Sequence, residues 1–145
     1  MVSSAVRLAV LLVLVCLSSS MLCEGTQYIV GDNGGWALDI DYQKWASGKQ
    51  FFAGDSLVFN YGGDEETHNV IVVTGSAVDG CVKEPNLGVY ESGNDELFLS
   101  GTGDLGFLCG MADHCTSGMK LKITVKAAPV SQGVSLSPAA AAPST

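Results

Sequence analysis

Apolar and polar side chains alternate along several short stretches of the chain, most regularly over residues 120–126, where Lys and Thr alternate with Leu, Ile and Val. Alternation with a period of two is typical of a β-strand with one face in the core. Other apolar or alternating stretches, separated by glycine-containing turns, predict strands at 26–30, 49–52, 56–61, 67–73, 96–99 and 106–109. We expect one helical turn at 42–46, a turn at 100–105, and mostly irregular structure over 75–94.

This pattern predicts an all-β fold with one short helical segment. Short strands at regular spacing with abundant glycine turns are typical of a β-sandwich, either antiparallel or mixed. Trp36 and Trp45 are expected to pack in the core, because neither needs a role as a ligand.

The two ends of the chain differ in composition from the middle. Arg7 followed by an apolar run at 8–17 and a polar run at 18–25 is typical of a secretory signal peptide, with cleavage expected before Thr26. A retained membrane anchor is the alternative, and the short apolar run disfavours it. Residues 128–145 are mostly Ala, Ser, Pro and Val without charge, which predicts a disordered tail. The expected domains are therefore a signal peptide at 1–25, a folded domain at 26–127 and a tail at 128–145.

The chain is acidic, with a formal net charge of −8. Removal of the signal peptide takes away one Arg and one Glu and leaves this charge unchanged. Such a charge argues against nucleic acid as a partner, because phosphate binding needs basic residues. It either attracts cationic partners or only keeps the protein soluble.

Five cysteines are present, and two of them, Cys16 and Cys23, lie in the expected signal peptide. One disulfide and one metal-bound thiolate would account for the remaining three cysteines. Cys109 ends an apolar run that would shield its sulfur. Cys115 directly follows His114, and its side chain would point away from that of His114 in an extended segment. We therefore expect a disulfide between Cys81 and Cys115.

Residues 109–119 place a thiol, an imidazole and a thioether at steps of five, at Cys109, His114 and Met119. Five residues on a helix would put these groups on different faces. A loop bent at its glycines can instead turn all three inward. His68 is the only other histidine of the chain. Two His, one Cys and a weak axial Met form the blue-copper electron-transfer set, so we expect one copper ion here.

Three other functions use similar residue types. A structural zinc or copper-storage site is disfavoured because paired Cys-x-x-Cys spacing is absent. A hydrolase with Cys109 as nucleophile and His114 as base is disfavoured because a second His and a Met beside the thiol are better explained by a metal. The remaining alternative is an extracellular cell-wall or cell-surface interaction protein that uses the fold as a scaffold.

Several motifs together carry a resemblance to a known family. They are Val30 to Trp36, Trp45 to Lys49, Gly54 to Phe59, His68-Asn69-Val70 and Cys109 to Leu121. On these the chain resembles the phytocyanins, the plant blue copper proteins, and looks most similar to uclacyanin or plantacyanin types with an axial Met. The resemblance covers about residues 26–125. Asp113 departs from the family pattern, since many members have Gly before this histidine.

The resemblance implies a cupredoxin-like Greek-key sandwich with one type 1 copper held by His68, Cys109, His114 and Met119. It also implies the disulfide Cys81–Cys115. Asn69 is expected to hydrogen-bond across to the Cys109 loop, although ordinary turn chemistry would explain it equally well.

In functional terms, we expect a secreted, extracellular or apoplastic protein that is not an enzyme. It would carry single electrons by cycling between Cu(I) and Cu(II), and would exchange them with a small redox molecule or a redox protein. We expect it to be a monomer without a transmembrane span in the mature chain.

Overall fold

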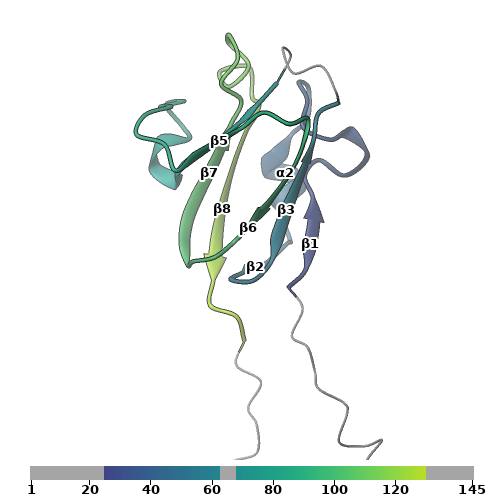
Figure 1. Ribbon diagram of the computed structural model, residues 1–145, viewed down its shortest axis with the longest axis vertical. Coiled ribbons are helices and arrows are strands. Elements are labelled where there is room, and N and C mark those ends of the chain that lie inside the picture. The colour runs from purple at the N-terminus through teal and green to yellow at the C-terminus, as the bar shows by residue number, and fades with distance from the viewer. Residues whose placement is uncertain (1–24, 63–67, 130–145) are drawn as a thin grey trace, which may run out of the picture.

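The computed structural model describes residues 25–62 and 68–129, which form two β-sheets packed face to face (Figure 1). In chain order its elements are β1 (Gln27–Ile29), the 3-10 turn η1 (Asp32–Gly34), α2 (Tyr42–Ala46), β2 (Phe51–Phe52), β3 (Ser56–Asn60), β4 (Val70–Thr74), η2 (Gly75–Ala77), β5 (Gly88–Tyr90), β6 (Asn94–Phe98), β7 (Gly103–Leu108) and β8 (Lys120–Lys126). The expected all-β sandwich with one short helix is confirmed.

Both sheets are mixed. The smaller sheet has the strand order β1-β3-β6 and the larger has the order β2-β8-β7-β4-β5. The pairs β1–β3 and β2–β8 are parallel, and the remaining pairs are antiparallel. The chain changes sheet at every step from β1 to β4, and again between β5 and β6 and between β6 and β7. These crossovers hold the two layers together.

The core explains the alternation seen in the sequence. In β8, Leu121, Ile123 and Val125 are buried, and Lys122 and Thr124 between them are more exposed. Trp36 and Trp45 both lie in the core, as expected.

Strand β4 is buried along four consecutive residues, because both of its faces are covered. Val70 and Val72 pack between the sheets, whereas Ile71 and Val73 pack outside against Val78 and Cys115. A strand covered on both faces is apolar without alternation.

Residues 75–94 are mostly irregular, as expected, but they also contain η2, β5 and the start of β6. β5 is a short edge strand with exposed residues, so the sequence shows no burial pattern for it. The expected turn at 100–105 was wrong over its second half, because β7 begins at Gly103 instead of 106. Its first residues have low β-propensity, but Asp104 pairs with Thr124, whose hydroxyl donates to the Asp104 carboxylate at 2.6 Å.

The expected signal peptide and tail lie almost entirely outside the described residues. Within the described ranges, no helix combines the length and apolar character needed to cross a bilayer.

Candidate metal centre

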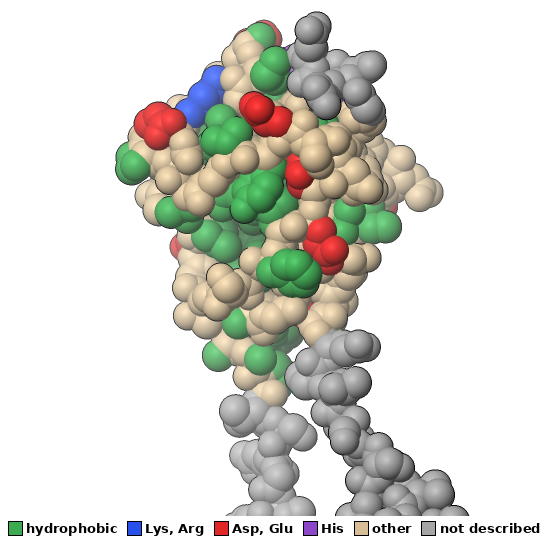
Figure 2. Space-filling model, viewed as in Figure 1, with side chains coloured by type: hydrophobic (Ala, Val, Ile, Leu, Met, Phe, Trp, Pro, Cys, Tyr) green, Lys and Arg blue, Asp and Glu red, His purple; other side chains and the backbone are tan. Residues whose placement is uncertain are grey.

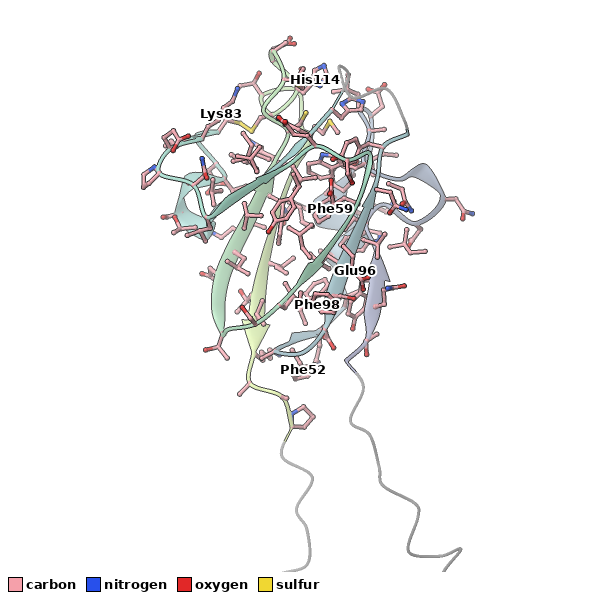
Figure 3. All side chains as sticks on the ribbon, viewed as in Figure 1. Phe52, Phe59, Lys83, Glu96, Phe98 and His114 are labelled. Atoms are coloured by element: carbon pink, nitrogen blue, oxygen red, sulfur yellow. A yellow bond between two sulfur atoms is a disulfide. The ribbon has the colours of Figure 1, made fainter. Side chains whose placement is uncertain are left out.

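The four candidate ligands lie at one end of the larger sheet, where three neighbouring strands begin or end. His68 lies two residues before β4, Cys109 directly follows β7, and Met119 directly precedes β8. Ile71 and Lys120 both pair with Leu108, so the start of β4 and the start of β8 flank the end of β7. This end, marked by His114 in Figure 3, is opposite the end at which Phe52 lies.

Three ligand atoms converge in the structure. Nδ1 of His68 lies 3.2 Å from Nδ1 of His114, and Sγ of Cys109 lies 3.8 Å from the first nitrogen and 3.5 Å from the second. A point about 2 Å from all three atoms exists at these separations, and zinc bonds to nitrogen and sulfur measure about 2.0 to 2.3 Å. The donor set therefore fits a single small metal ion.

The candidate ligands differ in their exposure to solvent. Cys109 is 0% and Met119 1% exposed, and His68 is also buried. His114 is half-buried, so the imidazole of His114 is the ligand side chain closest to solvent. A buried thiol offers no access to a substrate, which further disfavours a hydrolytic role for Cys109.

Burial lowers the pKa of His68, and the neighbouring His114 lowers it further. Both causes act against the charged imidazolium. Since a histidine must be neutral to bind a metal, the surroundings of His68 favour the metal-binding form.

The loop from Cys109 to Met119 is held by its own backbone. Met119 donates its N–H to the carbonyl of His114 at 2.9 Å, and Cys109 donates to the carbonyl of Met119 at 3.1 Å. Gly118 has a φ of +104°, which favours glycine and closes the turn. The structure thus brings Met119 to the base of the loop that carries Cys109 and His114.

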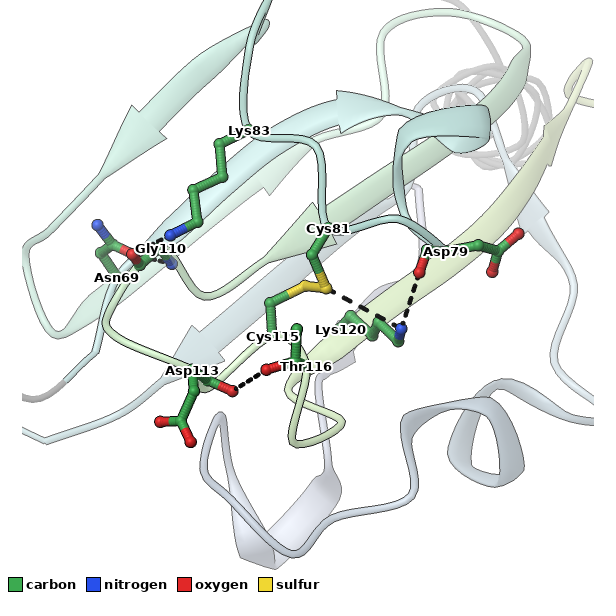
Figure 4. The surroundings of a disulfide bond; sticks show 9 residues. All are labelled: Asn69, Asp79, Cys81, Lys83, Gly110, Asp113, Cys115, Thr116 and Lys120. Atoms are coloured by element: carbon green, nitrogen blue, oxygen red, sulfur yellow. Dashed lines mark hydrogen bonds between the residues drawn. A yellow bond between two sulfur atoms is a disulfide. The ribbon is translucent and has the colours of Figure 1, made fainter.

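A disulfide joins Cys81 to Cys115, the pair expected from the sequence (Figure 4). It ties the ligand loop to the segment after η2 and leaves Cys109 as the free thiol among the described residues. The reason for this pairing differs from the expected one. Residues 112–118 form consecutive turns instead of an extended segment, and Cys115 packs with Val78 on the outer face of the sheet.

Asn69 makes the hydrogen bond expected of it. Its side-chain Oδ1 accepts from the backbone N–H of Gly110 at 2.6 Å, and its backbone carbonyl accepts from Nε1 of Trp36 at 2.9 Å. The side-chain bond therefore links the segment after His68 to the segment after Cys109.

Two charged residues near the site were missed by the sequence analysis. Nζ of Lys83 donates to the carbonyl of Gly110 at 2.6 Å, and Oε1 of Glu91 accepts from Nδ2 of Asn69 at 3.4 Å. Both residues lie in a region where no strand was expected, and no sequence motif marks them.

Comparison with known proteins gives consistent matches. The family model of the plastocyanin-like domain matches residues 36–119. Blue copper protein 1b of Medicago truncatula is 44% identical over 128 residues, which cover 88% of this chain and 77% of that protein. Stellacyanin of Toxicodendron vernicifluum is 39% identical over 105 residues, covering 69% of this chain and 96% of that protein.

Solved structures agree with these matches. Cucumber stellacyanin superposes with a TM-score of 0.65 at 36% identity, covering 73% of this chain and 99% of that protein. Cucumber basic protein, a blue copper protein, gives 0.62 at 38% identity, covering 69% and 99%. The expected cupredoxin-like fold is confirmed.

Proposed function

Because this chain belongs to the phytocyanin family of blue copper proteins, we propose that it carries single electrons through one type 1 copper ion. The observation that carries the proposal is the convergence of two imidazole nitrogens and one thiol sulfur within 3.8 Å of one another. Copper, when bound, supplies a centre that takes up and releases one electron between Cu(II) and Cu(I).

His68, Cys109 and His114 are the proposed strong ligands, and Met119 is the proposed weak axial ligand. A soft thiolate and thioether favour Cu(I), whereas imidazole nitrogens suit both oxidation states. The backbone bonds of the loop and the Asn69–Gly110 bond fix the ligands before the metal arrives. A fixed ligand set leaves little to rearrange when the electron moves.

Burial assigns different tasks to the two imidazoles. His68 and Cys109 are both buried, and Cys109 packs in the hydrophobic core. His114 is half-buried at the loop end of the sandwich, so the imidazole of His114 is the proposed route by which electrons enter and leave.

The proposed partner is a redox protein or small redox molecule, with a cationic surface favoured. The net charge of −8 attracts such partners over a distance, although the same charge also serves solubility. On the face drawn in Figure 2, acidic side chains recur and basic ones are sparse. We propose a monomeric electron carrier that is not an enzyme.

Secretion to the extracellular space, including the apoplast, is part of the proposal. It is supported by the signal-peptide pattern of residues 1–25 and by the Cys81–Cys115 disulfide, because disulfides persist in oxidising compartments.

Visible absorption and electron paramagnetic resonance of the purified protein, with metal analysis, test the proposal. We expect one copper per chain and a strong thiolate-to-copper band. Cys109→Ser should abolish the band, whereas Ser117→Ala, an exposed change in the same loop, should leave it in place. Zinc in the native protein, or an unchanged band in Cys109→Ser, would refute the proposal.

A further inference from the structure

Four groups beside the metal centre form one continuous chain of hydrogen bonds. Oε1 of Glu91 accepts from Nδ2 of Asn69 at 3.4 Å, and Oδ1 of Asn69 accepts from the N–H of Gly110 at 2.6 Å. The carbonyl of Gly110 then accepts from Nζ of Lys83 at 2.6 Å. Figure 4 shows the part of this chain that joins Asn69, Gly110 and Lys83.

All links of the chain point in the same direction. The side-chain amide of Asn69 turns its N–H toward the Glu91 carboxylate and its carbonyl toward Gly110, whose own N–H and carbonyl belong to two successive peptide groups. The two bonds of the Asn69 amide polarise each other, and the bond from the ammonium is charge-assisted. The chain is thus a row of dipoles with a negative charge at one end and a positive charge at the other.

The two residues in the middle of the chain adjoin two candidate ligands in sequence. Asn69 follows His68, and Gly110 follows Cys109. Both residues lie in close surroundings. A Cβ built on Gly110 would lie 2.6 Å from Cδ1 of Ile71, and the backbone carbonyl of Asn69 accepts a hydrogen bond from Trp36. A change at either charged end therefore acts on the ligand loops directly.

We propose that Lys83 and Glu91 are positioning residues that set the reduction potential of the metal site in opposite directions. The proposal rests on the proposed electron-carrier function. Uptake of an electron lowers the positive charge of the site, so the Lys83 ammonium favours the reduced state and the Glu91 carboxylate favours the oxidised state.

The effect of Lys83 is the larger of the two. Lys83 is partly buried and its link is short, whereas Glu91 is exposed and its link is long. Exposed charges are screened by water and salt more than partly buried ones.

The experiment compares the reduction potentials of four copper-loaded variants with that of the wild-type protein. Lys83→Met removes the charge and the donor, Lys83→Arg keeps both, and Glu91→Gln removes the negative end. Lys126→Met is the matched control, because it removes the same charge from an exposed residue at the far end of β8.

At a fixed solution potential, Lys83→Met should lower the ratio of reduced to oxidised protein by about threefold to tenfold, where tenfold corresponds to 59 mV. Glu91→Gln should raise the ratio by about twofold. Lys83→Arg should keep the ratio within about twofold of the wild-type value. Lys126→Met should leave the ratio nearly unchanged, because the charge of Lys126 is screened.

The proposal is overturned if Lys83→Met shifts the ratio no more than Lys126→Met, or if Lys83→Met and Glu91→Gln shift it in the same direction. A purely structural lysine would lower thermal stability without moving the potential. If Lys83→Met takes up no copper, the direction of the Glu91→Gln shift decides alone. A wild-type protein without the thiolate-to-copper band would instead refute the electron-carrier function itself.

Discussion

The backbone N–H of Cys109 donates to the carbonyl of Met119 at 3.1 Å, although ten residues separate them. This bond closes the base of the ligand loop and joins the end of β7 to the start of β8. It fixes the backbone of Met119, the proposed axial ligand, relative to that of Cys109 without the help of a metal.

Met119→Gln should keep the blue colour and lower the reduction potential. An amide oxygen is a harder donor than a thioether and favours Cu(II) over Cu(I). We expect a decrease of about 59 mV or more, which is tenfold in a one-electron equilibrium. Voltammetry measures it, with Met111→Gln as control, because Met111 lies in the same loop but only packs against the core. Equal potentials in wild type and Met119→Gln would remove Met119 from the site.

Gly110→Ala should destabilise the protein. Its new Cβ would lie 2.6 Å from Cδ1 of Ile71 and 3.0 Å from Oδ1 of Asn69. Overpacking of this kind costs about 1 to 3 kcal/mol in the free energy of unfolding. Urea unfolding of the metal-free protein measures the loss. Gly101→Ala, where no atom lies within 4 Å, is the control and should change little; equal stabilities of both variants would contradict the crowding seen here.

Replacing both cysteines of the disulfide, as Cys81→Ala with Cys115→Ala, should lower the free energy of unfolding by about 3 to 4 kcal/mol. The bond closes a loop with a sequence separation of 34, and loop closure of that length predicts this loss in the chain-entropy model. Chemical denaturation of the metal-free protein gives the value. Cys109→Ser serves as reference, since its sulfur takes no part in the bond. A loss below about 1 kcal/mol would count against the entropic account.

Tyr42 should make the fold sensitive to alkali. Burial raises the pKa of Tyr42 to about 12, against about 10 in the unfolded chain. Between these values the unfolded chain releases the phenol proton and the folded protein keeps it. Stability should therefore fall as pH rises through this window, by up to about 1.4 kcal/mol per pH unit.

Tyr42→Phe isolates this effect. The variant should lose the Tyr42 part of the alkaline slope, and Tyr61, whose pKa is also raised, should supply the rest. At neutral pH the variant should be less stable by about 1 to 3 kcal/mol, because the N–H of Ala37 loses its partner at 2.7 Å. Urea unfolding at several pH values, in the Cys109→Ser background to prevent thiol exchange, gives both numbers. Parallel pH profiles with and without the phenol would contradict the assignment.

The candidate ligands and the disulfide could be predicted because their residue types are rare in this chain. With two histidines, and three cysteines beyond the expected signal peptide, few combinations exist, and the motifs around them resemble a known family. Strand β8 could be predicted because its burial alternates from residue to residue.

The missed features depend on contacts between distant residues. Strand β5 is an edge strand that forms only against β4, and its sequence carries no burial pattern. The role of Lys83 was missed for the same reason. In the sequence it looks like any surface lysine, and only the fold brings it to Gly110, 27 residues away. The structure also corrected the reason for the Cys115 pairing, because turns, not strand alternation, orient that side chain.

The Cys81–Cys115 bond has a consequence for how the molecule matures. Cys81, Cys109 and Cys115 can combine in three different pairs, and only one of them spares the sulfur that faces the two imidazoles. A disulfide that includes Cys109 would yield a colourless isomer, and added copper could not restore the site without thiol exchange. Correct maturation would therefore depend on the order of events. Either Cys81 and Cys115 form their disulfide first, or a bound metal ion already protects the Cys109 sulfur from oxidation.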